Sequence, residues 1–304
     1  MPGMTTRRRF LRDTALLTTG AAGAIAAGPV CAAEPISREG PRRVRLSCAA
    51  YSYRTYLSGD NPTMTLDDFI EKCADMGLDG TEPTTYYFPK PVTREYCIHL
   101  KRKAFLLGMD ISGTAIGNNF CRPPGPERDG QIAATKQWTE YAGALGAPCM
   151  RVFAGSAPKG VPDDEARQWV VECLEECSEA AAQHGVFLAV ENHGGVVATA
   201  DGMLAILSAV KSEWCGANLD TGNFHTQDPY ADMAKVAPYA VNVQVKTDVR
   251  AAGGPSQEAD FKRIVEILRA ASYGGYLVLE YEAKEDPMTG VPKGIERLRA
   301  AVEL

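Results

Sequence analysis

The feature that most constrains the fold is a repeated unit in which a helical stretch, a glycine and a short apolar run follow one another. Met76-Gly77, Leu107-Gly108 and His184-Gly185 each end a helical stretch, and an apolar run follows each glycine. Glycine is the residue that most readily takes the left-handed conformation that ends a helix. Eight apolar runs have the length of strands that are buried on both faces. The expected strands are 44–50, 78–83, 109–115, 148–154, 186–192, 215–220, 241–246 and 276–282.

The spacing of these runs predicts a closed barrel. They begin about 26–40 residues apart, which leaves room for one crossover helix after each strand. The helix after the seventh expected strand is predicted to start at Ser256. Eight such units in about 271 residues fit a (β/α)8 TIM barrel better than an open, doubly wound sheet. A doubly wound sheet usually carries a GxGxxG turn, and the sequence has none. We therefore predict an α/β fold with a single barrel domain over residues 34–304.

Residues 1–33 are predicted to be an export signal outside the fold. The run TRRRFLR at residues 6–12 resembles the twin-arginine consensus, and an apolar, Ala/Gly-rich stretch follows over residues 14–30. Small residues near Ala33 suit cleavage, which would leave no stable membrane span. We expect a periplasmic or secreted protein. The sequence leaves open whether Cys31 is lipidated.

The composition and net charge limit the classes of partner that the protein is expected to bind. The chain is 45% hydrophobic and 23% charged, which is ordinary for a globular protein and excludes disorder. Its formal charge of −6 becomes about −9 when the signal is removed. An acidic surface does not attract a nucleic-acid backbone, so we expect a small-molecule partner and no nucleic acid. The oligomeric state is left open.

Polar side chains gather where the predicted strands end, which is where barrel enzymes place their active sites. Glu191, Asp220, Gln244 and Glu280 fall on four consecutive strands, five to eight. Three carboxylates at one mouth repel one another unless a cation lies between them, and a divalent metal would provide it. The other strand-end candidates are Glu82, Arg151, Lys246 and Glu282.

Several of these segments resemble a known family. The chain is similar to the xylose-isomerase-like barrel superfamily of sugar isomerases and epimerases over about residues 44–300. That superfamily includes tagatose and psicose 3-epimerases, inosose dehydratases and hydroxypyruvate isomerase. The segments that carry the resemblance are Glu191-Asn192-His193-Gly194, Asp220-Thr221-Gly222-Asn223, Val245-Lys246 and Leu279-Glu280-Tyr281.

The resemblance implies a metal site made by Glu191, Asp220, Gln244 and Glu280. Gln244 stands where the family usually has histidine, and Asn223 stands where many members have another histidine. With glutamine the ligand set contains only oxygen atoms, which favours Mn²⁺ or Mg²⁺ over Zn²⁺.

The resemblance also implies a reaction. The chain is expected to be a metal-dependent sugar isomerase or epimerase that transfers a proton through an enediolate, with a sugar or glycoside as substrate. Two alternatives stay open: a lyase or hydratase of keto-sugars or keto-glycosides on the same site, and a non-catalytic exported sugar-binding barrel. The expected catalytic residues are Glu191, Glu280, His193 and Lys246, and the expected substrate contacts are Asn118, Asn119, Arg151, His193 and His225. Asn118 and Asn119 could instead be turn residues.

Overall fold

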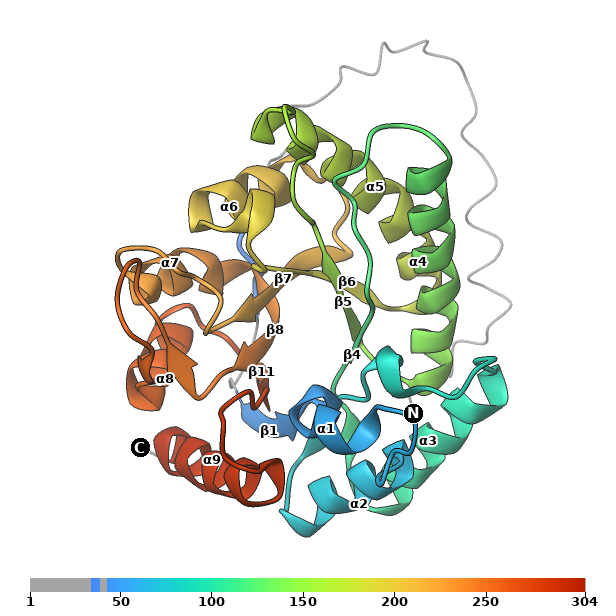
Figure 1. Cartoon of the computed structure of the whole chain (residues 1–304), viewed down its shortest axis with the longest axis vertical. Coiled ribbons are helices and arrows are strands. Elements are labelled where there is room, and N and C mark those ends of the chain that lie inside the picture. The colour runs from blue at the N-terminus through green and yellow to red at the C-terminus, as the bar shows by residue number, and fades with distance from the viewer. Residues whose placement is uncertain (1–33, 39–42, 304) are drawn as a thin grey trace, which may run out of the picture. The chain divides into compact units, whose positions relative to one another are not determined.

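The computed structural model describes residues 34–38 and 43–303. The predicted export signal at residues 1–33 lies outside them and stays a prediction. Figure 1 shows a ring of strands at the centre with helices packed around its outside. This arrangement confirms the α/β barrel that the repeated unit predicts.

Seven strands form one curled parallel sheet in the order β1-β11-β8-β7-β6-β5-β4. The eighth position is taken by a short parallel pair, β2 with β3. Single parallel bridges, Ala49 to Glu82 and Thr84 to Ala115, join this pair to β1 and β4 and close the ring. The bounds are β1 Val44–Cys48, β2 Gly80–Thr81, β3 Asp110–Ile111, β4 Thr114–Ala115, β5 Cys149–Phe153, β6 Phe187–Glu191, β7 Cys215–Asp220, β8 Ala240–Val245 and β11 Gly275–Leu279.

Three expected elements differ from the structure, the first being the strand expected over residues 78–83, of which only β2 Gly80–Thr81 is formed. The third predicted strand is split into β3 and β4, and Gly113 lies between them, so close to its neighbours that a Cβ there would lie 3.0 Å from Cys149 Sγ and 3.1 Å from Glu82 Oε2. The helix expected from Ser256 begins only at Phe261, so that expectation was wrong. Where that helix was expected to start, the chain forms strand β10 Gln257–Glu258, which pairs antiparallel with β9 Asp248–Val249.

The helices begin and end where the sequence provides caps. Thr65 and Asp68 form a capping box that starts α2, and Gly185 ends α5 with a φ of 66°. Three acidic residues lie in the first turn of α5, where they interact favourably with the helix dipole. The bounds are α1 Arg54–Leu57, α2 Leu66–Asp75, α3 Arg94–Leu106, α4 Pro126–Leu145, α5 Asp163–His184, α6 Ala200–Ala209, α7 Pro229–Val236, α8 Phe261–Ala270 and α9 Pro287–Val302.

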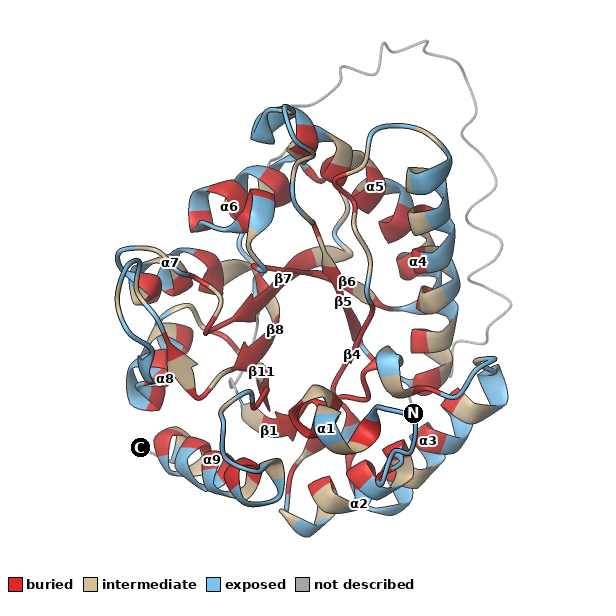
Figure 2. Cartoon of the chain, viewed as in Figure 1, coloured by how far each residue is buried: buried red, intermediate tan, exposed pale blue. Residues whose placement is uncertain are grey.

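The core lies between the strands and the inner faces of the helices. Figure 2 shows buried residues along the strands and exposed residues on the outer helix faces. In α8, for example, Phe261, Ile264, Val265 and Leu268 are buried, which is one stripe at helical spacing. None of the helices in the described part of the chain is long and apolar enough to cross a membrane.

Candidate active site at the carboxyl ends of the strands

The sheet brings the predicted carboxylates to one mouth. Glu191 ends β6, Asp220 ends β7 and Glu280 directly follows β11. Strands β7 and β11 lie on either side of β8, and β6 lies next to β7. Asp220 is paired in register with Gln244 of β8. All three carboxylates are buried, with exposed fractions of 3% for Glu191, 0% for Asp220 and 6% for Glu280. The structure brings these strand ends together at one mouth, and their shared role as a site stays a prediction.

Lys246 is the cation among three carboxylates. Its Nζ lies 2.8 Å from Glu280 Oε2, 3.2 Å from Asp220 Oδ2 and 2.7 Å from Glu282 Oε2. Its backbone N–H donates to the hydroxyl of Thr221, which fixes the start of the side chain. The lysine side chain is only 12% exposed, so these contacts are screened little by water.

Arg151 is the second cation, and it pairs with Glu191. Arg151 Nε lies 2.9 Å from Glu191 Oε2, while the other carboxylate oxygen, Oε1, accepts a hydrogen bond of 2.9 Å from Asn223 Nδ2. The guanidinium also donates to the Ile116 carbonyl at 2.8 Å and to the Tyr86 hydroxyl at 3.3 Å. Glu191 is therefore held on both of its oxygens, by the buried Arg151 and the partly buried Asn223.

Four further side chains form a closed ring of hydrogen bonds: Glu82, Asn218, Asn242 and Gln244. Gln244 Nε2 donates to Glu82 Oε1 at 2.7 Å, and Asn242 Nδ2 donates to Glu82 Oε2 at 3.0 Å. Asn242 Nδ2 also donates to Asn218 Oδ1, and Asn218 Nδ2 donates to Gln244 Oε1 at 2.6 Å. Because a carboxylate only accepts, Glu82 fixes which end of the Gln244 amide faces it.

Burial and neighbouring charges shift the pKa values of the three carboxyl groups in different directions. Burial raises the pKa of Glu191 to about 7, with Arg151 opposing the rise and Glu280 adding to it. Burial also raises the pKa of Asp220 well above its usual range. For Glu280, burial would raise the pKa, but the charge and hydrogen bond of Lys246 hold it below the usual range. The negative charge at neutral pH is therefore most firmly placed on Glu280.

The oxygen donors of the site are of the type that a divalent ion prefers, but other side chains of the protein occupy them in this structure. Glu191, Asp220, Gln244 and Glu280 would bind through oxygen, and Asp220 Oδ2 is buried and makes no hydrogen bond, its contact with the Lys246 ammonium at 3.2 Å being an ion pair. The lysine ammonium nevertheless lies between Asp220 and Glu280, and both polar atoms of Gln244 are hydrogen-bonded to residues outside this set. Within residues 34–38 and 43–303, no three His, Cys, Asp or Glu side chains are arranged to hold one metal ion.

The predicted asparagine contacts are occupied by the protein itself. Asn118 pairs with the backbone of Phe153, accepting from its N–H and donating to its carbonyl, both at 2.8 Å. Asn119 accepts from the Cys121 N–H, and its own N–H donates to Gln131. Neither residue has the left-handed conformation that the turn alternative allows for, and their role in substrate binding stays a prediction.

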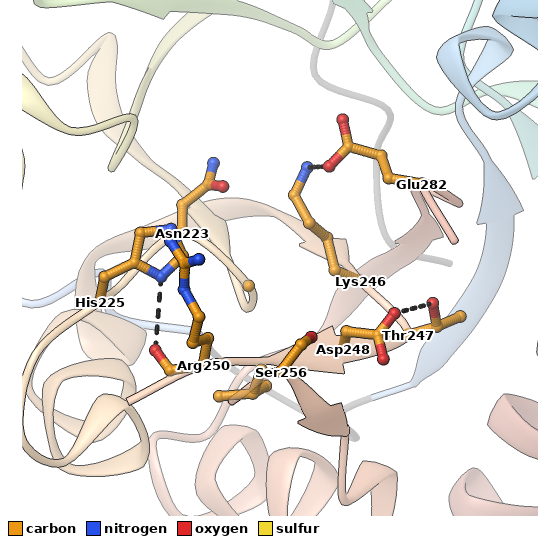
Figure 3. A pocket seen from close by; sticks show the side chains of 10 residues that line it. Asn223, His225, Lys246, Thr247, Asp248, Arg250, Ser256 and Glu282 are labelled. Carbon is orange, nitrogen blue, oxygen red and sulfur yellow. Dashed lines mark hydrogen bonds and ion pairs between the residues drawn. The ribbon is translucent and has the colours of Figure 1, made fainter. Parts of the chain in front are cut away.

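The two predicted histidines lie at the rim. His193 is exposed and its ring lies 4.6 Å from that of Phe153, centroid to centroid, while burial of one side and the charges of Arg151 and Lys246 lower its pKa. His225 lines a cavity of about 260 Å³ beside Lys246, and its Nδ1 lies 3.3 Å from the Arg250 carbonyl oxygen. Figure 3 shows His225 and Asn223 on one side of this cavity, with Lys246 reaching Glu282 on the other.

Sequence reasoning missed part of the site. Asn218 and Asn242 were not among the candidates, although each precedes a candidate residue by two positions and so faces the same side of its strand. Glu82 was recognised as a strand-end carboxylate but received no role. Tyr86 lies in a short 3-10 helix, Thr85–Tyr87, where no strand pattern points to it.

Comparison with known families identifies the chain. The profile described as "Xylose isomerase-like TIM barrel" matches residues 70–301. The chain belongs to this family. The match confirms the resemblance that the strand-end motifs show. A comparison with curated protein sequences gives no match.

Solved structures of other proteins share the fold of this xylose isomerase-like barrel. The D-psicose 3-epimerase of Clostridium cellulolyticum H10, crystallised with D-tagatose, is 17% identical, with 85% of this chain and 97% of that chain covered and a TM-score of 0.66. The 3-keto-D-glucoside 4-epimerase of E. coli is 15% identical, with 86% of this chain and 100% of that chain covered and a TM-score of 0.63. The IOLI protein, crystallised with a zinc atom, is 18% identical, with 84% of this chain and 96% of that chain covered and a TM-score of 0.65. At these identities the likeness shows the fold.

Proposed function

We propose that the protein is a sugar isomerase or epimerase that moves a proton on a carbon next to a carbonyl group. The observation that carries this proposal is the pair of buried carboxylates, Glu191 and Glu280, each held by its own cation at one barrel mouth. Epimerases of keto-sugars and keto-glucosides among the proteins with a similar fold support sugar as the substrate class.

The residues divide the work of proton transfer. Glu191, positioned by Arg151 and Asn223, and Glu280, positioned by Lys246, are the two bases that remove and return the proton. Loss of the proton leaves an enediolate, whose negative charge the Lys246 ammonium stabilises. Return of the proton to the other face gives epimerisation, and return to the neighbouring carbon gives isomerisation. His193, at the rim, is proposed to contact substrate hydroxyls.

We also propose that the site takes Mn²⁺ or Mg²⁺ on Glu191, Asp220, Gln244 and Glu280. The support is the all-oxygen donor set, since hard cations prefer oxygen ligands. Such an ion would act as a Lewis acid on the substrate carbonyl.

A larger substrate is the second candidate. The cavity of about 260 Å³ adjoins Lys246 and is lined by polar side chains such as Asn223, His225 and Arg250, so it has room for a second sugar ring or another leaving group. A keto-glycoside bound across both regions could lose its β-oxygen substituent after the same proton abstraction. This favours the lyase or hydratase reaction as the alternative to isomerisation. We propose a neutral sugar or glycoside in either case.

Solvent proton exchange tests the proposal. The Mn²⁺-loaded protein is incubated in D₂O with free sugars, sugar phosphates, keto-sugars and keto-glycosides, and deuterium incorporation and products are followed by NMR. Deuterium in recovered substrate or in an isomer supports the proposed function, and an unsaturated or hydrated product supports the lyase alternative. Binding without any exchange across the panel would instead indicate a sugar-binding protein.

We propose that the twin-arginine run exports the protein. Replacing Arg7 and Arg8 by lysine should leave the precursor in the cytoplasm, as measured by cell fractionation. Normal export of this double variant would contradict the proposal.

A further inference from the structure

We infer that the Lys246 ammonium and a divalent ion compete for Asp220 and Glu280, so that metal enters this site only when Lys246 withdraws toward Glu282. The inference rests on the metal site proposed above and concerns how that site is controlled. It starts from the ion-pair distances, which place one ammonium within 3.2 Å of both Asp220 and Glu280. A cation bound to both carboxylates would need the same space.

Charge balance favours an exchange of cations. One ammonium is shared among the carboxyl groups of Asp220, Glu280 and Glu282. When Lys246 pairs with Glu282 alone, that pair is neutral, and the remaining two carboxylates match the double charge of the metal. Glu282 suits the outer position because its side chain is 38% exposed, whereas that of Asp220 is fully buried.

The surroundings of Lys246 leave room for this movement. Lys246 and Glu282 both line the cavity of about 260 Å³, and in Figure 3 the lysine side chain extends along it to Glu282. The stem of Lys246 lies against Gly222, where a Cβ would come within 2.6 Å of the lysine Cδ. Lysine carries a compact charge on a flexible stem, so it can change partners without a new backbone position.

Mn²⁺ binding to the purified protein tests the inference. Isothermal titration with MnCl₂ should show that Lys246→Met lowers the Kd at least about tenfold relative to wild type, because no ammonium has to leave. Lys246→Arg should raise the Kd, because the guanidinium fork holds carboxylates more rigidly. Lys103→Met is the matched control: this lysine on α3 also pairs with two carboxylates and is 21% exposed, and its loss should leave the Kd unchanged.

Glu282 tests the direction of withdrawal. Glu282→Gln should weaken Mn²⁺ binding severalfold in wild type but have no effect in the Lys246→Met background, because the glutamate acts on the metal only through the lysine. If Lys246→Met is too unstable to titrate, the increase in Tm that Mn²⁺ produces in Lys246→Met and in wild type gives the same comparison.

Three results would overturn the inference. An equal or higher Kd in Lys246→Met would show that the lysine does not compete, and no Mn²⁺ binding by any variant would show that there is no metal to compete with. Weakening by Glu282→Gln that persists in Lys246→Met would show that Glu282 contacts the ion directly. Proton exchange with sugars is measured separately, so the proposed reaction can succeed or fail independently of these results.

Discussion

Arg151 and Lys246 both neutralise buried carboxylates at the barrel mouth, but their surroundings differ. The Arg151 side chain is 5% exposed, pairs with one carboxylate and is fixed by the Ile116 carbonyl and the Tyr86 hydroxyl. Lys246 is 12% exposed, lies beside an open cavity and shares its charge among three carboxylates. One side of the mouth therefore has a fixed ion pair, and the other has a cation with several partners.

The difference indicates a division of labour. A planar guanidinium with several fixed hydrogen bonds holds Glu191 in one orientation, which suits a base that must meet substrate at a defined angle. A lysine among three carboxylates can release one of them and remain paired with another. The arginine side is thus built for positioning and the lysine side for exchange of charge.

The largest expected effect is on catalysis at the lysine side. Glu280→Gln removes a base and the most firmly placed negative charge of the site, so proton exchange in D₂O should fall about 10²- to 10⁴-fold. Some metal should remain bound, which Mn²⁺ titration measures. Retained exchange in this variant would exclude Glu280 as a base. It would leave Glu191, the residue on the arginine side, as the remaining candidate.

The next effect is on stability and separates the two cations. Arg151→Met leaves Glu191 buried without a cation and should lower the free energy of unfolding by about 3–5 kcal/mol in urea denaturation. Lys246→Met should cost less, and added Mn²⁺ should restore the loss, because the carboxylates it leaves can bind another cation. Equal losses in the two variants, both insensitive to Mn²⁺, would contradict the contrast between a fixed and an exchangeable cation.

A smaller effect is expected at Gln244, between the two sides. Gln244→His adds a nitrogen donor, so the preference for Zn²⁺ over Mn²⁺ should rise about tenfold or more in competition titrations. Gln244→Ala is the companion variant, and weaker Mn²⁺ binding is expected if the amide oxygen is a ligand. An unchanged Mn²⁺ affinity in Gln244→Ala would remove Gln244 from the ligand set and leave its hydrogen bonds to Glu82 and Asn218 as its role.

The smallest effect concerns the support of the arginine side. Asn118 holds the Phe153 backbone, two residues beyond Arg151 on β5, through two hydrogen bonds. Asn118→Ala should lower the free energy of unfolding by about 1–2 kcal/mol. His225→Ala, at the rim of the cavity, should change it by less than about 0.5 kcal/mol. A large decrease in substrate affinity with unchanged stability in Asn118→Ala would support the substrate-binding role instead.

Much of the architecture followed from local patterns in the sequence. The helix, glycine and strand repeat predicted eight strand positions, and the ring of strands confirms them. Helix α5 has the bounds that its acidic start and terminal glycine predict. These signals are readable because capping and periodicity depend on residues only a few positions apart.

The strand-end rule likewise located Glu191, Asp220, Gln244 and Glu280 at one mouth without any knowledge of distances. It could not show which residues they contact. Gln244 hydrogen-bonds Glu82 across 162 positions of sequence, and Lys246 meets Glu280 across 34. No local pattern encodes such pairs.

Tertiary structure decided these partners through strand order and register. Asp220 lies opposite Gln244 only because β7 and β8 pair with a shift in register between Ala217 and Asn218. A shift of one residue would turn every side chain of a strand to its other face. The sequence by itself thus determined the barrel and the edge at which its polar residues gather. The closed ring of strands determined which carboxylate each cation neutralises, because only closure brings side chains from distant strands within hydrogen-bond reach.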